Sequence, residues 1–265
     1  MLIAEILFLI YVIKGETLFV KPFKKMIQDN IKKIKENIVL SCQKIDRDPK
    51  DITLVAITKT ATMEEIKQVL DLGLFDIGEN KIQEAVLKFS RLSTVKWHMV
   101  GHLQTNKVKE AVKIFDLIHS VDSIRVAEEI DKQASNINKI QDILVQVNAS
   151  VEASKFGIKP QEAIEIIKEI AKLKNLNIKG LMTIVPIVDN PEQVRPYCRM
   201  LRELKDRINQ LILRQAQDTS LKDTEQSRSA NNQLTILSMG MTDDYQVAIE
   251  EGATMIRLGR AIFGH

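Results

Sequence analysis

The sequence has few cysteines and histidines and lacks the common motifs of several enzyme classes. Its 265 residues include only Cys42 and Cys198, and neither has a partner at metal-ligand spacing. We therefore expect no disulfide framework, and a reducing cytoplasm fits this composition. The absence of a Walker loop, a dinucleotide glycine motif and a nucleophile elbow disfavours nucleotide hydrolysis, hydride transfer and triad hydrolysis. Zinc chemistry is also disfavoured, because four histidines form no metal-ligand pattern: His98, His102, His119 and His265.

The chain also lacks a dense basic block and an apolar run of membrane-spanning length. Its 38 basic and 35 acidic residues are interspersed and give a net charge of +3, so nucleic-acid binding gains no support. Residues 1–13 are almost wholly apolar but include Glu5, are too short to cross a bilayer, and lack the features of a secretory signal. We interpret residues 1–25 as an extra apolar leader without stable membrane insertion; a membrane-touching helix is the alternative.

What the sequence does contain is a regular alternation of short apolar runs with longer helical patterns. Alternation of this kind implies parallel strand pairing through right-handed helical crossovers. Eight repeats predict a single (β/α)8 barrel of the TIM type, and a doubly wound open sheet is the alternative. The runs expected as strands are 52–58, 74–77, 95–100, 117–121, 143–147, 178–184, 235–237 and 255–258.

This α/β barrel domain is expected to occupy residues 26–265. It should open with an amphipathic helix from Met26, because Ile27, Ile31, Ile34 and Ile38 recur at helical spacing. The composition of 45% apolar and 28% charged residues is that of a soluble protein with a sizeable core.

Local signals mark several helix boundaries and one insertion. Thr62 and Glu65 form a capping box, and Asp122 or Ser123 caps a later helix. Residues 215–232 are rich in Gln, Ser, Thr, Asp and Asn. They predict a disordered or loosely ordered polar insertion, dispensable for ligand binding, after a helix that ends near Leu213.

Lys59 lies immediately after the first apolar strand. Residues at the C-terminal ends of barrel strands carry the chemistry of this fold, and partial desolvation there lowers the pKa of an amine and favours attack on a carbonyl. Lys59 is therefore a candidate Schiff-base lysine. Taken alone, a solvated lysine at a strand end is the simpler interpretation.

Two glycine-containing turns follow the seventh and eighth strands. Gly240 lies in the segment 238–244 and Gly259 in the segment 257–260, each of which leads into a helix. Glycine lets the backbone approach a ligand, and amides at a helix start attract anions. Barrels of this type often hold phosphate at these two loops, so the pair predicts a phosphate site, although either glycine alone would be read as a plain turn.

Polar residues follow three other strands at the same edge of the predicted barrel. Asn80 follows the second strand and His102 the third, where it is either an acid-base group or a structural cap. Lys155, after the fifth strand, is a second cation at this edge or a solvated lysine. His98 lies within the third strand and is expected to be a packed core histidine.

Six segments, in order along the chain, resemble the pyridoxal phosphate homeostasis proteins. The resemblance extends from about Met26 to Gly264. The segments are 54–60 (LVAITKT), 77–80 (IGEN) with Gln83 and Glu84, 97–107 (WHMVGHLQTNK), 119–123 (HSVDS), 154–158 (SKFGI) and 237–241 (LSMGM).

The resemblance implies a barrel like the N-terminal domain of alanine racemase, with pyridoxal 5'-phosphate (PLP) bound as a covalent aldimine at Lys59. It places Asn80 near the ring hydroxyl and Arg257 near the ring or phosphate, and four further residues at the phosphate: Ser238, Gly240, Gly259 and Arg260. Many relatives have a small hydroxyl residue where Arg260 stands. The leader and the polar insertion have no counterpart in the family pattern.

The sequence favours a cofactor binder over an enzyme. A racemase needs two acid-base groups on opposite faces of the cofactor, and none of the three tyrosines, Tyr11, Tyr197 and Tyr245, stands at a predicted strand end. The second group of alanine racemase comes from a β-domain, which we do not expect here. We expect a monomer that holds PLP and passes it to PLP-dependent apoenzymes. The alternatives are a weak amino-acid racemase and a Schiff-base aldolase acting on a sugar phosphate.

Overall fold

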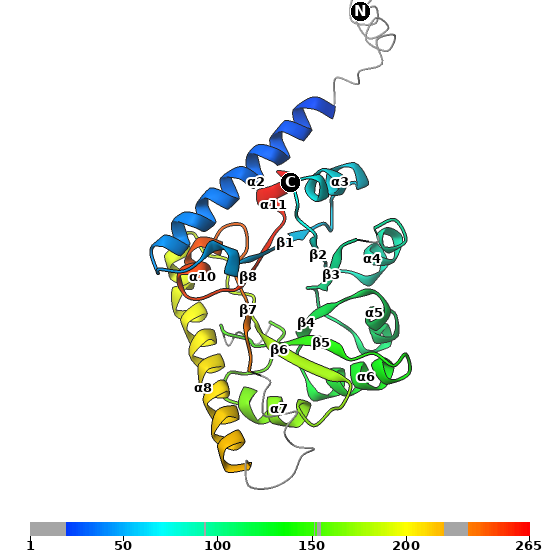
Figure 1. Cartoon of the computed structure of the whole chain (residues 1–265), viewed down its shortest axis with the longest axis vertical. Coiled ribbons are helices and arrows are strands. Elements are labelled where there is room, and N and C mark those ends of the chain that lie inside the picture. The colour runs from blue at the N-terminus through cyan, green and yellow to red at the C-terminus, as the bar shows by residue number, and fades with distance from the viewer. Residues whose placement is uncertain (1–19, 93, 151, 153–154, 220–232) are drawn as a thin grey trace, which may run out of the picture.

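Eight parallel strands close into a barrel, in the order in which they follow one another along the chain. The computed structural model describes residues 20–92, 94–150, 152, 155–219 and 233–265, and Figure 1 shows the strands at the centre of a ring of helices. The predicted barrel is confirmed, and the open sheet is excluded. The strands are β1 (Thr53–Ile57), β2 (Asp76–Glu79), β3 (Lys96–Met99), β4 (Leu117–Val121), β5 (Gln141–Gln146), β6 (Leu176–Met182), β7 (Ile236–Ser238) and β8 (Met255–Leu258).

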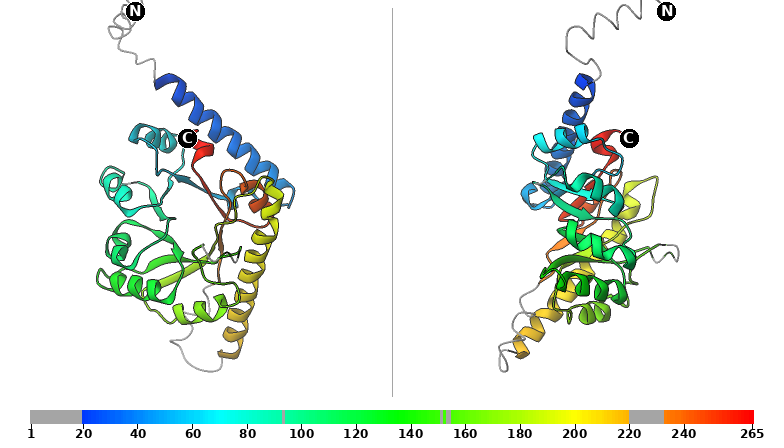
Figure 2. Two further views of the ribbon diagram at one scale, coloured as in Figure 1. Left: turned by 180° about the vertical axis from the view of Figure 1, so that it is seen from behind. Right: turned by 90° about the vertical axis from the view of Figure 1, so that its right-hand side faces the viewer.

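The outer ring consists of helices that connect successive strands, together with α2, which precedes β1, and α11, which follows β8. Figures 1 and 2 show α2 beside α10 and α11, where it covers the side of the barrel at which the last strand meets the first. The α-helices are α2 (Val20–Gln43), α3 (Met63–Asp71), α4 (Ile82–Phe89), α5 (Val108–Ile114), α6 (Ile124–Ser135), α7 (Ala163–Ile170), α8 (Arg195–Thr219), α10 (Tyr245–Glu250) and α11 (Arg260–Phe263). Short 3-10 turns are η1 (Pro49–Asp51), η2 (Thr105–Lys107) and η3 (Pro191–Val194).

The strands carry two apolar layers because their side chains alternate between the two faces of the sheet. The outward side chains of the strands pack against the helices, whose buried residues include Ile27, Ile31, Ile34 and Ile38 of α2. The inward apolar side chains form a small separate cluster inside the barrel: Val55, Leu117, Leu144, Met182 and Met255. Cys42 and Cys198 are buried free thiols, in line with the expected absence of a disulfide framework.

The predicted capping signals form as expected. The Thr62 hydroxyl accepts a hydrogen bond from the Glu65 amide, and the Glu65 carboxylate accepts one from the Thr62 amide at 2.8 Å. Of the two candidates for the cap of α6, Ser123 provides it, because its side chain accepts from the Val126 amide. Each cap satisfies donors that the first turn of a helix leaves without a partner.

Two helices are longer than the sequence predicted. Helix α2 begins at Val20, six residues before Met26, since a proline at position 22 is tolerated in a first turn. Helix α8 continues to Thr219, so the predicted end near Leu213 is wrong. The residues around Gln215 favour helix despite their polarity, because Arg, Gln and Ala are strong helix formers. Residues 1–19 and 220–232, which hold most of the proposed leader and insertion, lie outside the described residues. Within the part described, no helix is both long and apolar enough to cross a membrane.

Replacing Thr62 by Ala should lower the free energy of unfolding by about 1 kcal/mol, because the first turn of α3 loses its cap. Urea unfolding followed by circular dichroism measures the change. Thr60→Ala, at an exposed position in the preceding turn, is the control and should leave the midpoint unchanged. Equal midpoints for the two variants would contradict a stabilising role for the capping box.

Candidate functional site

Closure of the barrel brings the first and last strands together. β1 and β8 pair in parallel, with Val55 opposite Arg257 and Ala56 opposite Leu258. Lys59 follows the end of β1 and Gly259 the end of β8. A Cβ atom added to Gly259 would lie 3.4 Å from the Ile57 carbonyl oxygen, so the two chain segments are in contact. The predicted lysine and the second glycine turn therefore stand side by side.

Lys59 itself lies in a turn, and its side chain is exposed. The partial desolvation that the sequence predicted for this amine is therefore not found. The turn extends beyond the barrel edge, because β1 ends at Ile57 and the buried Thr58 separates the strand from Lys59. The exposed amine is accessible to a small-molecule carbonyl.

A buried ion pair fixes the backbone next to Lys59, and sequence reasoning missed it. Lys88 of α4 donates to the Thr58 carbonyl oxygen at 2.6 Å and to the Glu79 carboxylate at 2.7 Å. The Thr58 hydroxyl donates to the same carboxylate oxygen at 2.6 Å. Burial raises the pKa of Glu79, while Lys88 and Thr58 act to lower it. The strand end that carries Lys59 is thereby tied to α4.

The turn after β7 has a backbone that only glycine adopts easily. Gly240 has a φ of +95°, and a Cβ atom there would lie 2.8 Å from the Ala248 Cβ atom. Within this turn the Met241 amide donates to the Asp244 carboxylate at 2.6 Å. One of the amides expected to bind an anion is thus already paired with a side chain.

The two glycine turns are connected to each other. Arg260 forms an ion pair with Asp243, and both side chains are largely exposed. The Ala261 amide donates to the Thr242 hydroxyl at 3.3 Å. The structure therefore brings the turns after β7 and β8 into one continuous surface, with the Arg260 guanidinium at its edge.

Ser238 and Arg257 lie at the same end of the barrel, but their side chains face inward. The Arg257 guanidinium donates to the Ser238 hydroxyl at 2.6 Å and to the Thr183 carbonyl oxygen at 2.8 Å. Burial lowers the pKa of Arg257 to about 10, which leaves it charged at neutral pH. The Ser238 hydroxyl also bonds to His119, which is fully buried. The sequence did not predict this partner.

The remaining predicted residues lie in the loops after β2, β3 and β5. Asn80 is exposed and packs its backbone against Gly101, where an added Cβ would lie 2.1 Å from the Asn80 carbonyl oxygen. His102 pairs with Asp122 at 3.2 Å and stacks on Phe156, with ring centroids 3.8 Å apart.

The loop after β5 holds Lys155. Its ammonium group forms an ion pair with Glu152 at 3.0 Å, within the same loop. Asn148, at the end of this strand, donates to the Glu152 and Lys155 carbonyl oxygens and so shapes the loop. Lys155 is therefore held by its own loop, whereas His98 is a buried histidine within β3, as predicted.

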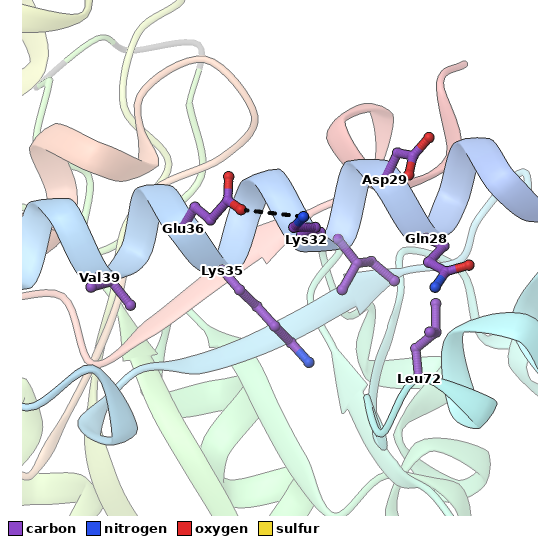
Figure 3. A pocket seen from close by; sticks show the side chains of 8 residues that line it. Gln28, Asp29, Lys32, Lys35, Glu36, Val39 and Leu72 are labelled. Carbon is purple, nitrogen blue, oxygen red and sulfur yellow. Dashed lines mark ion pairs between the residues drawn. The ribbon is translucent and has the colours of Figure 1, made fainter.

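The structure also has an open groove of about 570 Å³ that is unrelated to these residues. Figure 3 shows that its lining comes mostly from the outer face of α2, with Leu72 at the end of α3 opposite. Lys32 and Glu36, 4.0 Å apart, cross its rim. Its lining includes Lys32 and Lys35 but no glycine turn at a strand end.

The residues at the strand ends fit a ligand that combines an aldehyde with a phosphate. Lys59 offers an accessible primary amine, and Gly240 and Gly259 lie in the two connected turns. Arg257 and Arg260 supply two cations beside these turns. Fold and site together define a parallel (β/α)8 barrel whose candidate site is built from the ends of its first and last two strands.

Comparisons with known proteins agree with this class. The family model of the alanine racemase N-terminal domain matches residues 30–265. A pyridoxal phosphate homeostasis protein of Aquifex aeolicus is 39% identical over 238 residues, which cover 89% of this chain and 96% of the relative. The chain therefore belongs to the pyridoxal phosphate homeostasis proteins, within the alanine racemase N-terminal domain family.

Two solved structures are also similar. An unknown protein from Bifidobacterium adolescentis is 32% identical, with a TM-score of 0.76, and the match covers 91% of this chain and 96% of that one. PipY of Synechococcus elongatus, solved with PLP bound, is 29% identical, with a TM-score of 0.69 and coverage of 87% and 100%.

The Gly240 turn permits a comparison of two glycines with positive φ. Gly73→Ala should lower the free energy of unfolding by about 1 kcal/mol, because its φ is +81° but no atom lies within 4 Å of the added Cβ. Gly240→Ala should lower the free energy of unfolding by at least about 1 kcal/mol more than Gly73→Ala does, because its Cβ would also overlap Ala248. Urea unfolding of both variants tests this, and equal losses would show that the turn is not tightly packed.

The Glu79–Lys88 pair predicts a pH-dependent loss of stability. Lys88→Met leaves the Glu79 carboxylate buried without its cation and should lower the free energy of unfolding by about 3 kcal/mol at pH 7.5. The folded-state pKa of Glu79 is already raised and should rise further, so the folded state binds more protons than the unfolded state. Stability then falls as pH rises, and the loss should be smaller at pH 5. Urea unfolding at the two pH values measures it.

The matched control for this pair is Lys168→Met, which removes an exposed lysine from its ion pair with Glu165. It should change stability by less than about 1 kcal/mol at either pH. If Lys88→Met loses as little stability as Lys168→Met, the buried pair does not hold the strand end.

Proposed function

We propose that the protein binds PLP covalently at Lys59 as a Schiff base, keeps the reactive aldehyde sequestered, and releases it to PLP-dependent apoenzymes. The observation that carries the proposal is the contact between the β1 and β8 ends, which sets an accessible amine beside two linked glycine turns. The name of the Aquifex aeolicus relative and the PLP-bound PipY structure support it.

Each residue of the site then has a defined task. Bound PLP supplies an electrophilic aldehyde carbon and a dianionic phosphate. The neutral form of the Lys59 amine attacks that carbon, and one water molecule leaves as the carbon–nitrogen double bond forms; the reverse reaction releases the cofactor. The turns after β7 and β8 accept the phosphate, with Arg260 at the edge. Gly240 and Gly259 let these turns pack against α10 and the end of β1. In this proposal Asn80, His102 and Lys155 border the ring.

The positions of the described tyrosines favour a carrier over a racemase. The Tyr245 hydroxyl accepts a hydrogen bond from Asn37 of α2 at 2.9 Å, so it faces the outer helix. Tyr197 is part of α8 and packs against the outer apolar layer. Neither phenol is placed to exchange a proton at the end of β1, and Tyr11 lies outside the described residues. We further infer a monomer that works in the cytoplasm.

Replacing Lys59 by Ala tests the proposal. Wild-type protein mixed with PLP should develop a visible absorbance band, and borohydride reduction should fix one pyridoxyl group on the peptide that contains Lys59. The Lys59→Ala variant should lose both signals, because no amine replaces the one removed. Absorbance spectra and peptide mass mapping measure the outcome.

Lys81→Ala is the matched control, because Lys81 is another exposed lysine just after a strand at the same edge. It should retain the band and the label at Lys59. Labelling that moves to several lysines, or a band that survives in Lys59→Ala, would contradict the proposal. Rapid conversion of L-alanine to D-alanine would favour the racemase, and a colourless protein that cleaves a sugar phosphate would favour the aldolase.

A further inference from the structure

A continuous chain of polar side chains crosses the apolar interior of the barrel. Asp76 begins β2 at the N-terminal end of the barrel, and Ser238 ends β7 at the opposite end. Between them, His98 of β3 contacts Asp76 at 3.0 Å, and His119 of β4 contacts His98 at 3.0 Å. His119 then contacts Ser238 at 3.0 Å, and Ser238 contacts Arg257 at 2.6 Å. We call these five residues the relay.

The relay lies inside the barrel. A Cβ atom on Gly78, two residues after Asp76, would touch Val55, Ile57 and Val100, and Val55 belongs to the inward apolar cluster. Since side chains two residues apart share a face of a strand, Asp76 faces inward as well. His98, His119 and Ser238 are at most 3% exposed. Polar groups this deeply buried require hydrogen-bond partners, and each finds them within the relay.

The two ends of the relay fix the direction of every hydrogen bond. A guanidinium can only donate, and an ionised carboxylate can only accept. Burial, and then the nearby His98 and Arg257, hold the pKa of His119 well below its usual value, so His119 is neutral. With both rings neutral, a single order satisfies all members: Arg257 donates to Ser238, Ser238 to Nδ1 of His119, Nε2 of His119 to Nδ1 of His98, and Nε2 of His98 to Asp76.

This order has a consequence for the cofactor site. The Ser238 hydroxyl proton is directed to His119, so the hydroxyl is not available to donate to a phosphate oxygen. If one proton is added at Nδ1 of His119, the Nε2 proton of His119 passes to Nδ1 of His98. His119 stays neutral, now as the Nδ1–H tautomer, and Ser238 becomes the acceptor from His119. The Ser238 proton is then free to turn toward a ligand. The added positive charge stays on His98, beside the Asp76 carboxylate.

We propose that the relay couples phosphate capture at Ser238 to the uptake of one proton, whose charge is held on His98 beside Asp76. This inference rests on the proposed PLP site and describes how that site is regulated. His98 and His119 are positioning residues, because they act through Ser238. Because Nε2 of His98 already carries a proton, the added proton enters the relay from the Ser238 end. Asp76, whose side chain is 27% exposed, stabilises the resulting charge on His98.

Other charged groups face the relay from neighbouring elements. At the Asp76 end, Lys96 is the first residue of β3 and Asp142 the second residue of β5. Asp142 accepts a hydrogen bond from Asn177 at 2.7 Å. At the other end, Asp244 raises the pKa of Arg257 and so opposes the effect of burial. Of these carboxylates, Asp76 is the one bonded to a relay histidine, so its charge is the one that stabilises protonated His98.

Nitrogen-15 NMR of the two histidines tests the hydrogen-bond order in the ligand-free protein. At pH 8 both rings should be neutral Nε2–H tautomers. Pyridoxine 5'-phosphate, which has an alcohol in place of the aldehyde and forms no covalent bond, should change His119 to the Nδ1–H tautomer when it binds. A His119 ring that is already Nδ1–H without ligand, or that keeps its tautomer when the ligand binds, would overturn the proposal.

Calorimetry tests the proton uptake. Titration of pyridoxine 5'-phosphate in buffers of different ionisation enthalpy should show about one more proton taken up by wild type than by Asp76→Asn, which cannot stabilise protonated His98. Above neutrality, the affinity of wild type for this ligand should fall more steeply with pH than that of Asp76→Asn, by up to about tenfold per pH unit. Asp142→Asn, a carboxylate outside the relay, is the control and should behave as wild type.

The two proposals fail in different ways. Binding of pyridoxine 5'-phosphate with equal proton uptake in wild type and Asp76→Asn would refute the coupling and leave the cofactor site standing. No binding to wild type at any pH would refute the cofactor site, and the coupling with it.

Discussion

The parallel pairing of β1 with β8 is the interaction on which the site depends. These strands are about 200 residues apart in sequence, and their hydrogen bonds turn an open sheet into a closed barrel. Closure also removes the sheet edges that would otherwise expose unpaired backbone groups. Without it, Lys59 and the turn at Gly259 would lie at opposite edges of a sheet. Helix α2 reinforces the junction by packing on α10 and α11 at this side of the barrel.

The interior of the barrel combines an apolar cluster with a row of polar groups. Val55, Leu117 and Met255 exclude water, and in their surroundings an unpaired polar atom would be costly. The relay avoids that penalty because its donors and acceptors match in one order. A core filled only with aliphatic side chains would be simpler to stabilise. The polar row therefore has its clearest explanation in the site at its end, where Arg257 and Ser238 meet the turn at Gly240.

Much of the architecture could be predicted from local sequence signals. Short apolar runs lie at or beside the strands, so the sequence locates all eight, with boundaries within a few residues. The capping box at Thr62 was predictable because its hydrogen bonds join residues three apart. Lys59 and the glycine turns were found because the C-terminal ends of strands share one edge of any parallel barrel. The sequence predicts too early an end for α8, because a polar composition indicates disorder even where the residues favour helix.

Partnerships between distant strands could not be predicted. Nothing in the sequence near Lys88 indicates that it binds Glu79 and the Thr58 carbonyl oxygen. Nothing in the sequence near His119 indicates that it is the partner of Ser238. Such contacts depend on strand register and on which face a side chain occupies, and a shift of one residue reverses the face. The exposure of Lys59 likewise depends on how far its turn extends beyond the barrel.

A crystal structure of the protein grown with PLP tests the central claim most directly. The account predicts continuous electron density from the Lys59 side chain to the aldehyde carbon of the cofactor, with the phosphate against the turns at Gly240 and Gly259. Density for PLP in the groove along α2, or attached to a different lysine, would contradict it.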